Sequence, residues 1–205
     1  MSGERDGLLV DFGGVLTTNV FDAFADFCRA EGLAPDTVRD RFMTDPVARD
    51  LLGDLETGRI DEAAFEPHFA ELLGVERSEG LIDRLFAGML PEATMIDAVR
   101  AARRAGVRTG LVSNSWGQER YDRESFPELF DAVVISGEVG MRKPEPEIYA
   151  LAAERLGRPP ERCVFVDDLP GNLKPAAAIG MATVLHQDPA TTLDELERHL
   201  RVSLR

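Results

Sequence analysis

Polar side chains follow several short apolar runs of the chain, and side chains of these types could together act on a phosphate group. They are, in chain order, Asp11, Ser113, Asn114, Lys143, Asp167 and Asp168. Carboxylate oxygens suit a hard cation such as Mg²⁺, which proteins hold through few carboxylates plus substrate oxygens. A lysine offsets the charge of a phosphate, and a hydroxyl or an amide hydrogen-bonds its oxygens. A carboxylate so placed could also attack phosphorus and form an aspartyl-phosphate.

The elements that must position these side chains indicate a parallel sheet. Apolar runs typical of buried strands occur at 8–12, 107–113, 132–136, 163–167 and 182–185. Helical patterns separate them, at 95–105, 147–156, 173–179 and 192–200. Buried strands that alternate with helices predict an α/β fold with a central, Rossmann-like parallel sheet. Because ligands of such sheets bind beyond the carboxyl ends of the strands, we expect the six polar residues to meet there.

The interval 17–91 interrupts this alternation. Stripes of apolar residues at helical spacing begin at Phe21 and at Phe65, and no convincing strand occurs between them. We therefore predict an α/β core formed by 1–16 and 92–205, with an all-helical insertion at 17–91 directly after the first strand.

The composition restricts the classes of partner. The formal net charge is −14, which argues against charge-driven binding of nucleic acid or of anionic membranes. The two cysteines and three scattered histidines form neither a disulfide scaffold nor a zinc site. No secretory signal or membrane-spanning run is visible, so we expect a cytoplasmic protein that is a monomer or a homodimer.

Lysine is rare in this chain. Only Lys143 and Lys174 are lysines among 23 basic residues, and arginine fills the other positions. A lysine retained in such a background indicates a site that needs a compact amine rather than a wide planar guanidinium. We expect Lys143 to be that residue, and we expect Lys174 to be structural or to support the site only indirectly.

Four segments, in order, resemble the motifs of the haloacid dehalogenase superfamily. They are 9–16, 111–114, 142–144 and 165–168. One such motif would be weak evidence, whereas four in order, each at a predicted strand end or in the loop beyond it, are specific. Residues 139–149 and 167–176 are similar to the phosphatase domain at the N-terminus of soluble epoxide hydrolases. The helical insertion then resembles the cap that covers the active site in this family.

The resemblance implies a nucleophile and a magnesium site. Asp11 would be the nucleophile. Mg²⁺ would be held by Asp11, by the backbone carbonyl of Gly13 and by Asp168, and Asp167 would support them. The implied substrate is a small organic phosphate.

The resemblance also implies residues that bind this substrate or its transferring phosphoryl group. They are Ser113, Asn114, Lys143, Gly14 and Trp116, and Asn172 would shape the loop after the fourth strand. Ser113 and Lys143 belong to the catalytic set as well. For Trp116, the only tryptophan, two alternatives stay open: it lines the entrance below the cap, or it packs the loop.

One departure from the family pattern affects proton transfer. Phosphatases of the family usually carry a second aspartate two residues after the nucleophile, and Gly13 stands at that position. General acid–base catalysis contributes roughly two to four decades in rate. Turnover would then be slow, or limited to good leaving groups such as sugar-1-phosphates, or another group from the cap or the substrate would supply the proton. We expect the histidines to be surface or packing residues, and His68 of the insertion is a candidate for such a group.

Two further function classes remain open from the sequence. The absence of a carboxylate at Gly13 is compatible with a catalytically weak or silent binding or regulatory protein. A metal-independent haloacid dehalogenase also lacks that aspartate. Such dehalogenases usually lack the paired aspartates found here as Asp167 and Asp168, so the pair favours a phosphatase.

Overall fold

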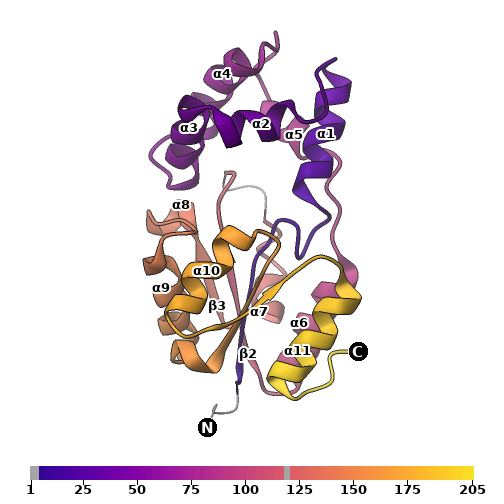
Figure 1. Ribbon diagram of the computed structural model, residues 1–205, viewed down its shortest axis with the longest axis vertical. Helices are drawn as coiled ribbons and strands as arrows, with labels where there is room; N and C mark the ends of the chain where they lie inside the picture. Colours follow the sequence, from indigo (N-terminus) through magenta and orange to yellow (C-terminus); the bar gives the residue numbers. More distant parts are fainter. Residues whose placement is uncertain (1–4, 118–120) are drawn as a thin grey trace.

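A central sheet of five parallel strands organises the molecule (Figure 1). The computed structural model describes residues 5–117 and 121–205. The strands are β1 (Gly7–Val10), β2 (Arg108–Ser113), β3 (Ala132–Ile135), β4 (Cys163–Asp167) and β5 (Ala182–Leu185). Their order is β3-β2-β1-β4-β5. The predicted α/β fold is confirmed, although β1 ends earlier than predicted, so that Asp11 lies just beyond it.

Helices cover both faces of the sheet. They are α6 (Ala93–Arg104), α7 (Phe126–Leu129), α8 (Ser136–Val139), α9 (Pro146–Leu156), α10 (Pro170–Ala178) and α11 (Pro189–Leu200), with a short 3-10 turn η1 (Pro160–Arg162). Leu8 and Val10 of β1 join one buried core with α6 and α11, and Leu9 joins the opposite core with α9 and α10. This alternation follows from the pleat of a strand that is buried on both faces.

Helix α11 begins earlier than the sequence pattern predicted. The side chain of Asp188 accepts a hydrogen bond from the backbone N–H of Thr191, and Pro189 occupies the first helical turn. Both are strong signals for a helix start, because an acidic side chain satisfies a free backbone N–H and proline needs no partner there. The helix packs against β4 and β5.

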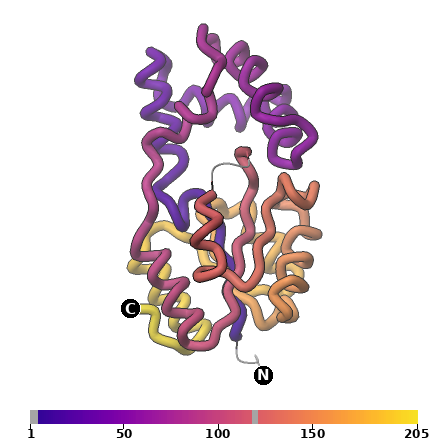
Figure 2. Tube along the Cα trace, turned by 180° about the vertical axis from the view of Figure 1, so that it is seen from behind, coloured from indigo at the N-terminus to yellow at the C-terminus, as the bar shows by residue number. Residues whose placement is uncertain are grey.

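Five helices lie between β1 and α6, and we call this segment the cap. They are α1 (Val20–Ala30), α2 (Thr37–Thr44), α3 (Pro46–Glu56), α4 (Glu62–Leu73) and α5 (Leu81–Leu85). The cap has its own buried core, built around Phe24, Phe65 and Phe69. Figures 1 and 2 show it above the sheet, on the side to which the carboxyl ends of the strands point. The domain boundary at residues 16/17 and 91/92 stays a prediction.

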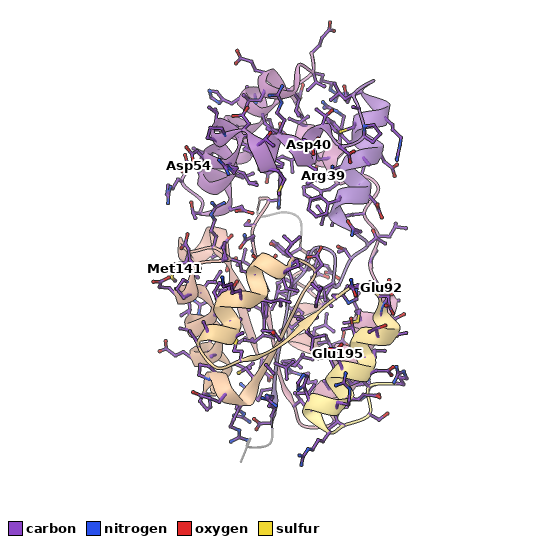
Figure 3. All side chains as sticks on the ribbon, in the orientation of Figure 1. Arg39, Asp40, Asp54, Glu92, Met141 and Glu195 are labelled. Atoms are coloured by element: carbon purple, nitrogen blue, oxygen red, sulfur yellow. The ribbon has the colours of Figure 1, made fainter. Side chains whose placement is uncertain are left out.

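The two linkers between the cap and the α/β core pair with each other. Thr18 donates its backbone N–H to the carbonyl of Leu90 over 2.8 Å, and Glu92 donates to the carbonyl of Leu16 over 2.9 Å. Figure 2 shows the linkers side by side, and Figure 3 places Glu92 at this junction. The pairing fixes where the cap leaves the sheet. No helix in the described part of the chain is long and apolar enough to cross a membrane.

Candidate active site

Three carboxylates meet beyond the ends of β1 and β4. Oxygens of Asp11, Asp167 and Asp168 all lie within 4.8 Å of one another. Asp11 is held in this position because its backbone N–H donates to the carbonyl of Val166 over 2.9 Å, which continues the pairing of β1 with β4. The parallel register therefore explains how residues far apart in sequence come together.

Lys143 joins two of these carboxylates. Its Nζ lies 2.7 Å from Oδ1 of Asp11 and 2.7 Å from Oδ2 of Asp167. The lysine comes from the loop between α8 and α9, and its side chain is buried. Burial alone would lower the pKa of Lys143, but the charges of Asp11 and Asp167 together raise it by more. The pKa therefore lies above its ordinary value, and the ammonium stays charged.

The negative charge of the cluster exceeds what Lys143 can neutralise. Burial raises the pKa of Asp11 well above its ordinary value, and the neighbouring Asp167 and Asp168 raise it further. Burial and the charge of Asp167 raise the pKa of Asp168 to about 6. Three acidic groups beside one ammonium thus leave a site that a divalent cation would stabilise.

Asp167 and Asp168 have different surroundings. Asp167 accepts hydrogen bonds from Nδ2 of Asn172 over 2.9 and 3.1 Å and from the backbone N–H of Leu169 over 2.9 Å. Asp168 instead lies against Gly14, where the backbone has a φ of 74° and any Cβ would collide with the carboxylate. Glycine permits both the positive φ and this close approach. Asn172 thus ties the start of α10 to the end of β4, and its role in shaping the loop between them stays a prediction.

The amide of Asn114 ties the loop after β2 to the loop that carries Lys143. Its Oδ1 accepts from the backbone N–H of Lys143 over 2.8 Å, and its Nδ2 donates to the carbonyl of Lys143 over 3.0 Å. Both backbone hydrogen-bonding groups of Lys143 are therefore held by one side chain. In this structure Asn114 positions the backbone of Lys143.

Ser113 has a partner that sequence reasoning missed. Its hydroxyl lies 3.0 Å from the hydroxyl of Tyr121, which is buried and packs against Phe12 with ring centroids 4.9 Å apart. Burial raises the pKa of Tyr121 to about 12, so the phenol keeps its proton. Either hydroxyl of this pair can donate to the other, and the Ser113 hydroxyl also donates to the backbone carbonyl of Asn114 over 3.4 Å. No motif marks this tyrosine.

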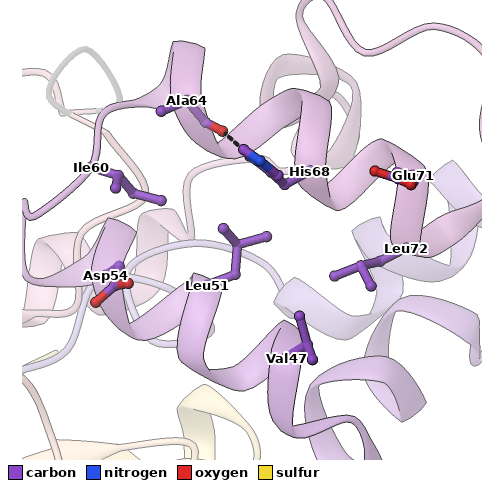
Figure 4. A pocket seen from close by; sticks show the side chains of 8 residues that line it. All are labelled: Val47, Leu51, Asp54, Ile60, Ala64, His68, Glu71 and Leu72. Atoms are coloured by element: carbon purple, nitrogen blue, oxygen red, sulfur yellow. Dashed lines mark hydrogen bonds between the residues drawn. The ribbon is translucent and has the colours of Figure 1, made fainter.

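The space beside Gly13 belongs to the cap. A Cβ added at Gly13 would lie 3.0 Å from Cγ2 of Val20, which is the first residue of α1. In the described part of the chain, apart from the sequence neighbours of Gly13, no acidic side chain lies within 4 Å of this Cβ position. His68, the substitute acid that the sequence suggested, is exposed and shares a hydrogen bond with the carbonyl of Ala64, and it lines a pocket of about 370 Å³ between α3 and α4 (Figure 4).

Trp116 projects from the loop after β2 into the cap. Its ring lies 5.1 to 6.0 Å, between centroids, from four phenylalanine rings: Phe24, Phe42, Phe65 and Phe86. This placement favours the packing alternative for Trp116. Its role as a substrate-binding residue stays a prediction.

Glu56 is a second group that the sequence analysis did not identify. This buried residue ends α3 of the cap and forms an ion pair of 2.6 Å with Arg142. Its Oε1 also accepts from Nδ2 of Asn114 over 3.3 Å. A lone glutamate in an amphipathic helix carries no sequence signal for such a contact, because only the tertiary fold brings it to the loops of the core.

The fold and this cluster define an α/β protein with an acidic site beneath a helical cap. The haloacid dehalogenase-like hydrolase family matches residues 6–180. The chain belongs to this family, and the resemblance found in the sequence is confirmed.

The chain is similar to several individual proteins and to solved structures. The chain is 38% identical over 111 residues to bifunctional epoxide hydrolase 2 of Rattus norvegicus, a match that covers 51% of this chain and 20% of that protein. It spans about a fifth of the length of the epoxide hydrolases it matches. It is 28% identical to hexitol phosphatase A of Escherichia coli K12, over 91% of this chain and 85% of that protein. A HAD-like family hydrolase from Porphyromonas gingivalis superposes with a TM-score of 0.73 at 26% identity, covering 97% and 99% of the two chains.

Proposed function

We propose that the protein is a Mg²⁺-dependent phosphatase of a small organic phosphomonoester, with Asp11 as the nucleophile. The observation that carries this proposal is the cluster of Asp11, Asp167 and Asp168 with the ammonium of Lys143 2.7 Å from two of the three carboxylates. Similarity to hexitol phosphatase A over 91% of the chain supports the class of reaction. A cytoplasmic location, and a monomeric or homodimeric state, are part of the same proposal.

The donor set fits magnesium. Carboxylate oxygens from two strand ends lie within 4.8 Å of one another, and hard divalent cations prefer such oxygens. Asp11 and Asp168 would hold the ion together with the carbonyl of Gly13, and Asp167 would support them. Bound there, Mg²⁺ would supply positive charge that draws the substrate phosphate to Asp11 and offsets charge in the transition state.

The reaction follows from the position of Asp11. One carboxylate oxygen attacks phosphorus, and the bond from phosphorus to the alcohol oxygen breaks as the aspartyl-phosphate forms. Water then attacks phosphorus, inorganic phosphate leaves, and the carboxylate is regenerated. Lys143 lowers the pKa of Asp11 and orients its carboxylate, and it would offset charge on the phosphoryl oxygens together with the hydroxyl of Ser113.

Proton transfer is where this site departs from its family. The alcohol takes up one proton as it leaves and the attacking water gives one up, so the two transfers cancel over the cycle. Val20 lies beside Gly13, and its aliphatic side chain can neither donate nor accept a proton. We therefore propose that substrates with good leaving groups react fastest, because their departure needs least help from an acid.

A release assay tests the proposal against the two alternatives. Inorganic phosphate is measured from an aryl phosphate and from a panel of sugar and polyol phosphates, with Mg²⁺ and with a chelator. The proposal expects release that requires Mg²⁺. Phosphate binding without turnover would instead support a silent binding protein. Halide release from a haloacid that a chelator does not affect would support a dehalogenase.

A further inference from the structure

Glu56 connects the cap to the core at three points. Its Oε2 accepts from Arg142 over 2.6 Å and its Oε1 accepts from Asn114 over 3.3 Å. Its backbone carbonyl accepts from the hydroxyl of Ser136, the first residue of α8. Figure 3 shows this side of the molecule, with Asp54 of α3 on the cap and Met141 below it on the core. A single cap residue thus contacts three segments of the core.

Two of these partners are directly connected to the backbone of Lys143. Arg142 precedes it in the chain, and Asn114 bonds to both its N–H and its carbonyl. The ammonium of the same lysine lies between Asp11 and Asp167. Glu56 is therefore separated by a single intervening residue from the lysine that reaches the carboxylate cluster.

Small residues allow the end of α3 to approach the core closely. A Cβ on Gly58 would lie 2.7 Å from the backbone oxygen of Gly137, and the residue has a φ of 71°. A Cβ on Gly53 would lie 3.1 Å from Cζ of Arg142. The guanidinium therefore packs against the helix that carries Glu56. The backbone contact and the ion pair of Glu56 both join the cap to the core in this arrangement.

The loop after β2, which belongs to the core, also contacts the cap. Ser115 donates its backbone N–H over 2.8 Å to the same Ser136 hydroxyl that bonds Glu56, and the next residue is Trp116, whose ring packs among the cap phenylalanines. The loop after β2 is thus attached to the cap through Glu56 and through Trp116. This loop also carries Asn114 and follows directly on Ser113.

Glu56 is stable in this place only while its partners are present. Burial raises the pKa of the Glu56 carboxyl, and the ion pair with Arg142 opposes that effect. A buried carboxylate without such a partner is strongly unfavourable. If the cap opened, Glu56 would be exposed to water, and Arg142 and Asn114 would each lose Glu56 as a hydrogen-bond partner.

We propose that Glu56 is a positioning residue of the cap: by holding Arg142 and Asn114 it makes the placement of Lys143, and hence phosphoryl binding, depend on cap closure. This inference rests on the proposed phosphatase function and names the cap residue through which that site is completed. Glu56 acts through other side chains and is not itself a catalytic residue.

A matched pair of variants tests it. Glu56→Gln keeps the size of the side chain and removes the charge that Arg142 needs. Glu66→Gln is the control, because Glu66 is a partly buried cap carboxylate that accepts from the backbone N–H groups of Gly80 and Ile82, which lie within the cap. For Glu56→Gln we expect kcat/KM on an aryl phosphate to fall about 10- to 100-fold, since misplacement by about 1 Å costs that much. Affinity for inorganic phosphate in the presence of Mg²⁺ should fall as well.

Two readouts need no turnover. Calorimetry measures binding of inorganic phosphate with Mg²⁺, and the emission of Trp116, the only tryptophan of the chain, reports on its burial in the cap. We expect weaker phosphate binding and a red-shifted emission for Glu56→Gln, and neither change for Glu66→Gln. In a double-mutant cycle of Glu56→Gln and Arg142→Gln, the loss of kcat/KM in the double variant should be far from the sum of the two single losses in free energy. The reason is that the two residues act as one unit.

The outcomes separate this inference from the proposed function. If the wild type hydrolyses no phosphate ester, the phosphatase proposal fails, and the binding and emission readouts decide the role of Glu56 alone. If the wild type is active and Glu56→Gln equals Glu66→Gln in kcat/KM, phosphate affinity and emission, then Glu56 is not a positioning residue. Additive effects in the Arg142 cycle would contradict the proposed route through that arginine.

Discussion

The ammonium of Lys143 lies 2.7 Å from Oδ2 of Asp167, a carboxylate that Asn172 and the backbone of Leu169 also hold. These contacts make Asp167 a support for the lysine. Asp168, by contrast, lies so close to Gly14 that a Cβ at this position would collide with its carboxylate. We therefore propose different tasks for the two adjacent aspartates: Asp168 would hold the metal, whereas Asp167 holds Lys143.

This division predicts different losses in two variants. Asp168→Asn removes a charged ligand and should abolish most of the Mg²⁺ affinity. Asp167→Asn takes one partner from a buried lysine and should lower the free energy of unfolding by roughly 3 kcal/mol, with a smaller effect on Mg²⁺ affinity, because breaking a buried ion pair costs several kcal/mol. Calorimetric titration with Mg²⁺ and chemical denaturation measure the two quantities. Equal loss of Mg²⁺ affinity in both variants would contradict the assignment.

Gly14 and Gly32 form a matched pair for a steric prediction. Both have a positive φ, 74° and 73°, but a Cβ on Gly14 would collide with Asp168, whereas a Cβ on Gly32 meets nothing within 4 Å. Alanine at either position carries similar backbone strain. We expect Gly14→Ala to weaken Mg²⁺ binding and phosphate release at least tenfold, and Gly32→Ala to retain both. Similar activity in the two variants would show that Gly14 does not hold Asp168 in place.

Restoring the missing acid should need more than one substitution. Gly13→Asp introduces a carboxylate, but its Cβ would press on Val20 at 3.0 Å. We expect Gly13→Asp together with Val20→Ala to raise turnover of substrates with poor leaving groups, because the acid can then protonate the departing alcohol. Gly13→Asp alone should gain less. The ratio of kcat for an alkyl phosphate to kcat for an aryl phosphate is the measurement, and an unchanged ratio in the double variant would count against this role for position 13.

The raised pKa of Asp168 makes the effect of magnesium depend on pH. Because its pKa rises from 3.8 to about 6 on folding, the protonated form stabilises the fold below pH 4, and this stabilisation is lost as the pH rises through 6. Mg²⁺ binds the charged form and compensates for that loss. The increase in Tm that Mg²⁺ causes should therefore be larger at pH 7.5 than at pH 5. An increase of the same size at both pH values would contradict the prediction.

Much of the site could be predicted because its parts are local. Asp11 and Asp167 each end a short apolar run, and a parallel sheet brings the carboxyl ends of its strands to one edge. The scarcity of lysine in the sequence singles out Lys143, and the fold buries its ammonium between two carboxylates. Patterns of residue type and spacing are sufficient for such features.

The remaining residues depend on tertiary contacts that leave no periodic signal. Glu56 is one of many acids on amphipathic helices, and only the approach of α3 to α8 brings it to Arg142. Tyr121 lies eight residues beyond Ser113, and only the fold brings its hydroxyl back to that serine. The environment of Trp116 could not be read from the sequence either, since its neighbours come from α1, α2, α4 and the segment after α5.

The central claim is that Asp11 is a nucleophile that carries the phosphoryl group. The most direct test measures release of inorganic phosphate from an aryl phosphate by the wild type and by Asp11→Asn, with Mg²⁺ and with a chelator. Asp11→Asn retains the size of the side chain, so Tm is followed as a control for folding. We predict Mg²⁺-dependent release by the wild type and a loss of at least about a thousandfold in the folded variant, because the covalent route is then closed. Release that is unchanged in Asp11→Asn would contradict the account.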